Sequence, residues 1–85
     1  MDYQKEIERK LSQAFNPSVL EVLDESYKHA GHAGADPDKG QTHFKVRIVS
    51  TDFEGLLPVA SHRKIYQVLS KELQEHVHAL SLEVN

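Results

Sequence analysis

The stretch THFKVRIVS, residues 42–50, is the clearest strand in the sequence. Its side chains alternate between apolar and polar, which is the period of a half-buried strand. The two faces are Phe44, Val46 and Ile48 on one side, and His43, Lys45 and Arg47 on the other. The pattern therefore predicts one face in the core and one wet, basic face.

Two further segments read as strands. SVLEVLD, residues 18–24, is short, rich in Val and Leu and bounded by turn formers, and HALSLEV, residues 78–84, alternates again. Between the first two strands lie residues 25–40, a connection of sixteen residues that holds three of the four glycines. Connections of that length are uncommon in a small domain and are usually functional or mobile.

Two helices complete the pattern. Residues 2–15 have helical spacing, with Asp2 as the N-cap and residues 16–17, Asn-Pro, as the stop. A second helix is predicted over residues 58–77, beginning at Pro58, with Ser70 as a candidate break. The side chains predicted to face inward are Tyr3, Ile7, Leu11, Ala14 and Phe15 from the first helix, and Val59, Tyr66, Leu69 and Leu73 from the second.

The order helix, strand, strand, helix, strand predicts a single α+β domain over residues 1–85, a three-stranded mixed sheet with its helices on one face. The first two strands pair antiparallel, and the helical crossover returns the third parallel to the second. The predicted core is Ile7, Leu11, Phe44, Val46, Ile48, Tyr66, Leu69, Leu73, Leu80 and Leu82.

This topology brings histidines together. The long connection enters the second strand where a parallel third strand also begins, so His29, His32, His43 and His78 are expected at one end of the sheet. Imidazole binds borderline metals and changes charge near neutral pH. Other interpretations stay open: the two loop histidines as solvated side chains, His43 as an exposed sheet-face residue, and His78 as a half-buried residue at a strand end.

The composition of the chain excludes several classes of function. The formal net charge of −3 argues against a protein devoted to neutralising phosphates, and the absence of cysteine excludes disulfides and a self-contained thiolate metal site. We expect a cytoplasmic protein, because no signal-like or membrane-spanning stretch is visible. We also expect that the protein is not an enzyme, because the sequence has no nucleophile motif and no phosphate-binding motif. DES at 24–26 is unsupported as a catalytic carboxylate pair.

Four separated blocks, VLDESYKH, THFKVRIVSTDFEG, HRKIYQVLSKEL and VHALSLEV, resemble the BolA family in order, spacing and residue type. The resemblance covers the chain from Val19 onward. It implies an αββααβ fold related to the type II KH domain. The chain departs from the family at Ser61, where an arginine is usual, and it lacks the GxxG loop of true KH domains.

The resemblance also implies a partner and a cofactor. BolA-like proteins pair with monothiol glutaredoxins, and the heterodimer shares a [2Fe-2S] cluster held by a glutaredoxin cysteine, a glutathione thiolate and two groups from the BolA side. Those groups correspond to His78 and, in the loop, to His29, with His32 as the competing loop ligand. No cluster is expected in the isolated chain, which would be a monomer or weak homodimer alone.

The alternative function is that of a nucleic-acid-binding transcriptional regulator, a role also described for the family. The basic residues that would serve it, expected near one another, are Lys45, Arg47, His62, Arg63 and Lys64. They could equally form a solvated face or dock glutaredoxin. With a negative net charge, contact with DNA is expected to be weak and steeply dependent on salt.

Overall fold

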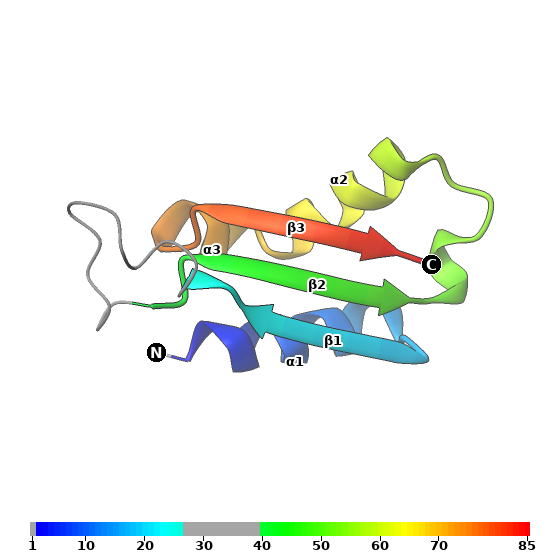
Figure 1. Cartoon of the computed structure of the whole chain (residues 1–85). Helices are drawn as coiled ribbons and strands as arrows, with labels where there is room; N and C mark the ends of the chain where they lie inside the picture. The colour runs from blue at the N-terminus through cyan, green and yellow to red at the C-terminus, as the bar shows by residue number, and fades with distance from the viewer. Residues whose placement is uncertain (1, 27–39) are drawn as a thin grey trace.

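The sheet has the predicted mixed topology (Figure 1). The computed structural model describes residues 2–26 and 40–85. The elements are α1 (Tyr3–Phe15), β1 (Val19–Asp24), β2 (His43–Val49), the short 3-10 helix η3 (Thr51–Phe53), α2 (Pro58–Val68), α3 (Ser70–Glu75) and β3 (Ala79–Val84). The strands follow the order β1-β2-β3. β1 pairs antiparallel with β2, and β2 pairs parallel with β3, so the α+β prediction is confirmed.

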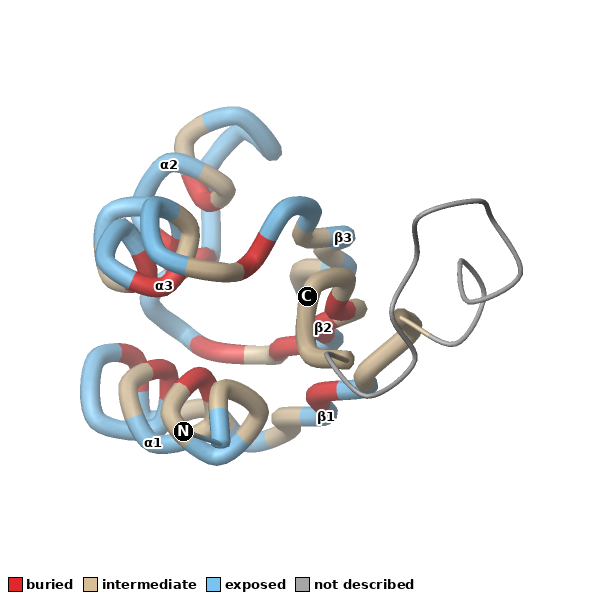
Figure 2. The backbone as a smooth tube through the Cα atoms, turned by 90° about the vertical axis from the view of Figure 1, so that its left-hand side faces the viewer, coloured by how far each residue is buried: buried red, intermediate tan, exposed pale blue. Residues whose placement is uncertain are grey.

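The helices cover one face of the sheet, and no helix within residues 2–26 and 40–85 covers the other, which is here called the open face (Figure 2). Alternation along β2 explains the layering, because its inward residues are buried while Arg47 on the opposite face is exposed. The core side chains are Ile7, Leu11, Phe15, Val22, Phe44, Val46, Ile48, Phe53, Ile65, Leu69 and Val77, with Leu73, Leu80 and Leu82 packed against them. Most of the predicted core is confirmed.

The first helix forms as its sequence predicts. Asp2 accepts a hydrogen bond from the N–H of Lys5 at the start, and Asn16 ends the helix in the left-handed region, with φ 43°. Ile7, Leu11 and Phe15 form its buried stripe.

The predicted helix over 58–77 is divided in two. The break falls at Leu69, directly before the candidate Ser70, and the second part ends at Glu75. Leu69 is 1% exposed, so the bend keeps it in the core with Ile65.

The prediction that Ala14, Val59 and Tyr66 face inward is wrong, because all three are exposed. The exposed fractions of Val59 and Tyr66 are 56% and 39%. The inward face of α2 contains Ser61 and Ile65 instead. Ser61 can be buried because its hydroxyl donates to the carbonyl of Pro58 at 3.0 Å. Ser61 and Ile65 are four residues apart and therefore share one face of α2. Val59 lies two residues before Ser61, and Tyr66 lies one residue after Ile65, so both side chains are on other faces of the helix and are turned toward solvent.

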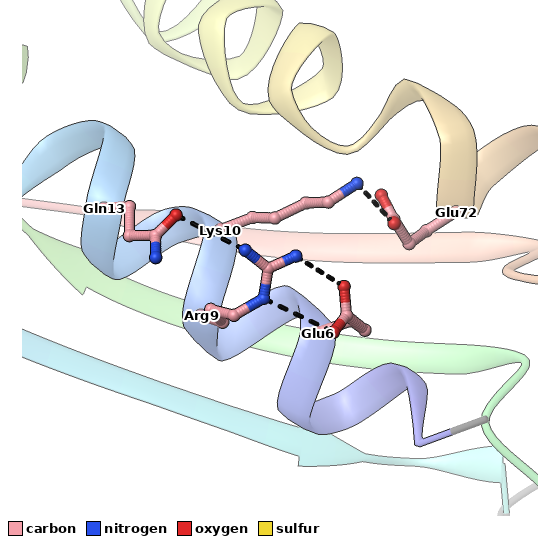
Figure 3. A network of polar contacts seen from close by, with 5 residues as sticks. All are labelled: Glu6, Arg9, Lys10, Gln13 and Glu72. Atoms are coloured by element: carbon pink, nitrogen blue, oxygen red, sulfur yellow. Dashed lines mark hydrogen bonds and ion pairs between the residues drawn. The ribbon is translucent and has the colours of Figure 1, made fainter.

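A buried ion pair joins α1 to α3 (Figure 3). Lys10 Nζ lies 2.5 Å from Glu72 Oε2, and Glu72 is 3% exposed. The second carboxylate oxygen of Glu72 has no hydrogen-bond partner among the described residues. The neighbouring pair of Arg9 and Glu6 lies on the surface, where the hydrogen bond from Arg9 lowers the pKa of Glu6.

We expect Lys10→Met to lower the free energy of unfolding by about 2 to 4 kcal/mol, because it leaves the buried Glu72 carboxylate without its counter-charge. The double variant Lys10→Met with Glu72→Met should recover most of the loss. Urea denaturation at neutral pH measures both. Arg9→Met, in the exposed pair, is the matched control and should change stability far less. An unchanged midpoint in Lys10→Met would show that water already screens Glu72.

Candidate metal-ligand site

His78 combines a fixed backbone with an accessible side chain. It lies between α3 and β3, and its N–H donates to the carbonyl of Thr42 at 2.8 Å. The N–H of Ala79 donates to the same carbonyl at 3.1 Å. The residue is exposed. Because the main chain is held while the imidazole faces solvent, His78 is suited to bind a group that arrives from outside.

His43 lies beside His78, as the topology predicts. It is the first residue of β2 and stands opposite Ala79 in the parallel register. The centroids of the two imidazole rings are 6.4 Å apart, and their planes differ by 20°. His43 Nδ1 is 2.8 Å from the hydroxyl oxygen of Thr42. The structure thus brings two of the four predicted histidines together.

His29 and His32 lie outside the described residues, but both ends of their segment are placed. Ser26 Oγ accepts from the N–H of Thr42 at 2.9 Å, and the N–H of Glu25 donates to the carbonyl of His43 at 2.7 Å. Asp24 accepts from two backbone N–H groups, of Ser26 at 2.9 Å and of Gln41 at 3.0 Å. Residues 26 and 40 are therefore held at the end of the sheet where His78 lies.

A second brace holds residues 40–41 from the helix layer. The rings of Tyr3 and His76 stack with centroids 4.8 Å apart and planes 5° apart. His76 Nε2 donates to the carbonyl of Gly40 at 3.2 Å, and the N–H of Tyr3 donates to the side-chain oxygen of Gln41. Gln41 itself adopts a left-handed φ of 71°. The beginning of α1 and the end of α3 thus fix where the connection enters β2.

Sequence reasoning missed this brace and the bonds made by Asp24 and Ser26. His76 directly follows α3 and belongs to no hydrophobic repeat of the sequence. The sequence interpretation of DES at 24–26 concerns catalysis alone. Short polar residues directly after a strand are typical of side chain to backbone turns, and that signal could have indicated their role.

The donors at this end suit a borderline metal. The imidazoles of His43 and His78 offer nitrogen donors of the kind that such metals bind, and the chain has no cysteine to add sulfur. Within residues 2–26 and 40–85, no cluster of three or more His, Asp or Glu side chains is arranged to hold a metal ion. A metal centre at His78 would therefore need at least one ligand from outside this described part.

The basic residues do not form one surface, which corrects the expectation that they lie near one another. Lys45 pairs with Glu83 at 2.9 Å and Arg47 with Glu21 at 3.3 Å, all on the open face of the sheet. His62, Arg63 and Lys64 belong to α2, in the helix layer on the other side. Side chains alternate across a strand, so Lys45 and Arg47 point away from α2.

No helix in the described part of the chain has the length and apolar character needed to cross a membrane.

Comparisons with known proteins agree with this architecture. A family model described as BolA-like protein matches residues 11–85. BolA-like protein 1 of Mus musculus is 46% identical over 77 residues, covering 91% of this chain and 53% of the mouse protein. The DNA-binding transcriptional regulator BolA of Vibrio cholerae is 46% identical over 76 residues, covering 89% of this chain and 67% of that protein.

The solved BolA domain of SufE1 from Arabidopsis thaliana has a TM-score of 0.88 and 41% identity, covering 100% of this chain and 92% of that chain. These matches identify the three-stranded mixed sheet with helices on one face as a BolA-type domain. The chain belongs to the BolA-like family. It spans about half the length of the mouse relative.

We expect Asp24→Ala to lower the free energy of unfolding by about 1 to 3 kcal/mol, because two half-buried backbone N–H groups lose their acceptor. Amide hydrogen exchange should speed up at Ser26 and Gln41, and denaturation gives the free energy. Asp52→Ala, which removes an exposed carboxylate in η3, is the matched control. Equal protection of both amides in Asp24→Ala and the parent would show that this carboxylate does not hold the connection.

Proposed function

We propose that this protein is a partner of monothiol glutaredoxin and co-ligates a bridging [2Fe-2S] cluster for iron-sulfur trafficking or iron regulation. The observation that supports the proposal most is the exposed imidazole of His78 on a backbone bonded to Thr42. Residues 26 and 40 lie at the same end of the sheet, and they flank the segment that contains His29 and His32. The proposal assigns the chain no catalytic residue.

Ligand chemistry supports a shared cluster. The chain contains no thiolate, so the glutaredoxin cysteine and a glutathione thiolate would supply the sulfur ligands. His78 and His29, with His32 as the alternative, would supply the two imidazoles. Imidazole ligation of one iron raises the reduction potential relative to a cluster held only by thiolates. Because a ligating histidine must be neutral at its coordinating nitrogen, acid should release the cluster.

His43 belongs in any test of this site, because the centroid of its ring lies 6.4 Å from that of His78. Its Nδ1 is 2.8 Å from the hydroxyl oxygen of Thr42. Within this proposal His43 is tested as a further alternative to the loop ligand.

The test is the visible absorption and circular dichroism of the heterodimer reconstituted with cluster-loaded monothiol glutaredoxin. We expect His78→Ala to alter the spectrum and stability of the cluster most, because its ligand is fixed by the backbone. His29→Ala should perturb the spectrum, and His32→Ala should matter less. Gln13→Ala, at an exposed position of α1, is the control and should leave the spectrum unchanged.

Other outcomes would change the assignment. Normal spectra in both His29→Ala and His78→Ala would remove the histidine-ligation mechanism. A loss confined to His32→Ala and His78→Ala would move the loop ligand to His32. A loss in His43→Ala and His78→Ala, with both loop variants normal, would move it to His43.

Nucleic-acid binding is the second candidate function. The name of the Vibrio cholerae relative favours it, as do the exposed Arg63 and Lys64 of α2. The paired carboxylates that neutralise Lys45 and Arg47 limit it, since these two cations already have partners on the open face.

We therefore expect binding to duplex DNA with a Kd in the micromolar range or weaker, roughly 10⁻⁶ M or above, near physiological salt. Fluorescence anisotropy over a series of salt concentrations measures it, and Arg63→Gln with Lys64→Gln should reduce the salt dependence. Lys45→Gln should have a smaller effect. A sequence-specific nanomolar site under these conditions would make the regulator function primary.

A further inference from the structure

The exposed apolar side chains of the described residues are concentrated in one region. The large exposed hydrophobic residues are Leu23, Leu56, Leu57, Val59 and Tyr66, and four of these five fall within residues 56–66. Leu57 is 72% exposed and Val59 is 56% exposed. Isolated exposed apolar side chains are ordinary, whereas a contiguous group of them marks an interaction surface. Val59 and Tyr66, which the sequence pattern predicts to face inward, belong to this group.

Among the described residues, β3 is a free edge of the sheet, and Tyr66 of this group contacts it. β3 is the last strand in the order β1-β2-β3. The N–H groups of Ala79 and Asn85 donate to the carbonyls of Thr42 and Ile48, on the β2 side. The alternate residues of the strand, Leu80, Leu82 and Val84, therefore direct their N–H and C=O groups to the outer side. The hydrogen bond from the Tyr66 hydroxyl to the carbonyl of Leu80, at 3.3 Å, agrees with this direction.

This edge lacks the usual protection. Proline, lysine and β-bulges blunt edge strands in natural proteins and prevent further pairing. The sequence of β3, ALSLEV, contains no proline or lysine, and its single charge is Glu83. Its outer backbone groups are therefore a template for another strand.

Helix α2 provides a wall for such a strand. In Figures 1 and 2, α2 lies on the helix side of the sheet and extends beyond the level of β3. Tyr66 reaches the edge, and Val59, seven residues earlier, shares its side of the helix. A strand added outside β3 would pair its backbone with Leu82 and Val84 and rest its inward side chains on Val59 and Tyr66.

The positive charge of α2 indicates which kind of partner would bind beside β3. α2 contains no Asp or Glu, although the whole chain has a net charge of −3, and its Arg63 and Lys64 are exposed. A second copy paired through the same edge would place two such helices side by side across a two-fold axis, where their like charges repel. Nucleic acid would leave Leu57, Val59 and the strand backbone without complementary groups.

We propose that the free edge of β3, together with residues 57–66, binds an extended acidic segment of another protein as an additional strand. Main-chain hydrogen bonds would give the affinity, and alternating apolar and acidic side chains would give the specificity. The proposal is independent of the histidine site, because no residue of that site takes part.

The experiment selects peptides from a random-sequence display library on the whole protein and titrates the enriched peptides as synthetic probes. We expect them to alternate apolar residues with Asp or Glu, and to protect the amides of Leu82 and Val84 from hydrogen exchange. Methylation of alternate backbone nitrogens of the peptide should abolish binding, because it removes the donors to the edge.

Matched variants separate this surface from general effects. Val59→Glu and Arg63→Glu should each weaken binding by about tenfold or more. Leu23→Glu and Lys71→Glu make the same changes at exposed positions elsewhere and should leave the affinity within about twofold. All four positions are exposed, and circular dichroism checks that each variant is folded.

The proposal would be overturned if the library yields no binder, if N-methylated peptides bind equally well, or if the control variants lose as much affinity as the surface variants. Dimerisation of the protein that Val59→Glu abolishes would assign the edge to a second copy. Displacement of the bound peptide by a single-stranded oligonucleotide at micromolar concentration would assign it to nucleic acid.

Discussion

The parallel pairing of β2 with β3 is the constraint on which the rest of the structure depends. It is anchored where the carbonyl of Thr42 accepts the N–H groups of both His78 and Ala79. Because parallel strands begin at the same edge, this pairing sets His78 beside His43 and beside the residues where the long connection leaves and returns. It also makes β3 an edge strand, with half of its backbone groups directed outward.

Much of the fold could be predicted because it is encoded in local pattern. The alternation in 43–49 determines both the strand and its buried face, and the crossover rule determines the direction of β3. The errors at Val59 and Tyr66 have a specific physical origin. A serine that satisfies its hydroxyl within its own helix can replace an apolar residue on the inward face, so hydrophobicity alone gave the wrong phase for α2. The break predicted at Ser70 is present, one residue earlier, at Leu69.

The candidate site was predictable to the extent that topology determines it. Strand order alone predicts that His43 and His78 meet, whereas His29 and His32 lie beyond the described residues and remain predictions. The stacking of Tyr3 on His76 joins positions that only the finished fold brings together. No periodicity in the sequence indicates this pair, because neither residue is unusual in its own segment.

Net charge alone does not predict which surfaces of the protein are basic. The value of −3 is a sum over surfaces that differ in sign. On the open face, Glu21 and Glu83 neutralise Arg47 and Lys45, so that basic-looking strand presents little free positive charge. On α2, no carboxylate accompanies Arg63 and Lys64. A sequence that alternates lysine and arginine with apolar residues can therefore be electrostatically neutral, while a short helical cluster in an acidic chain determines which partners its surface attracts.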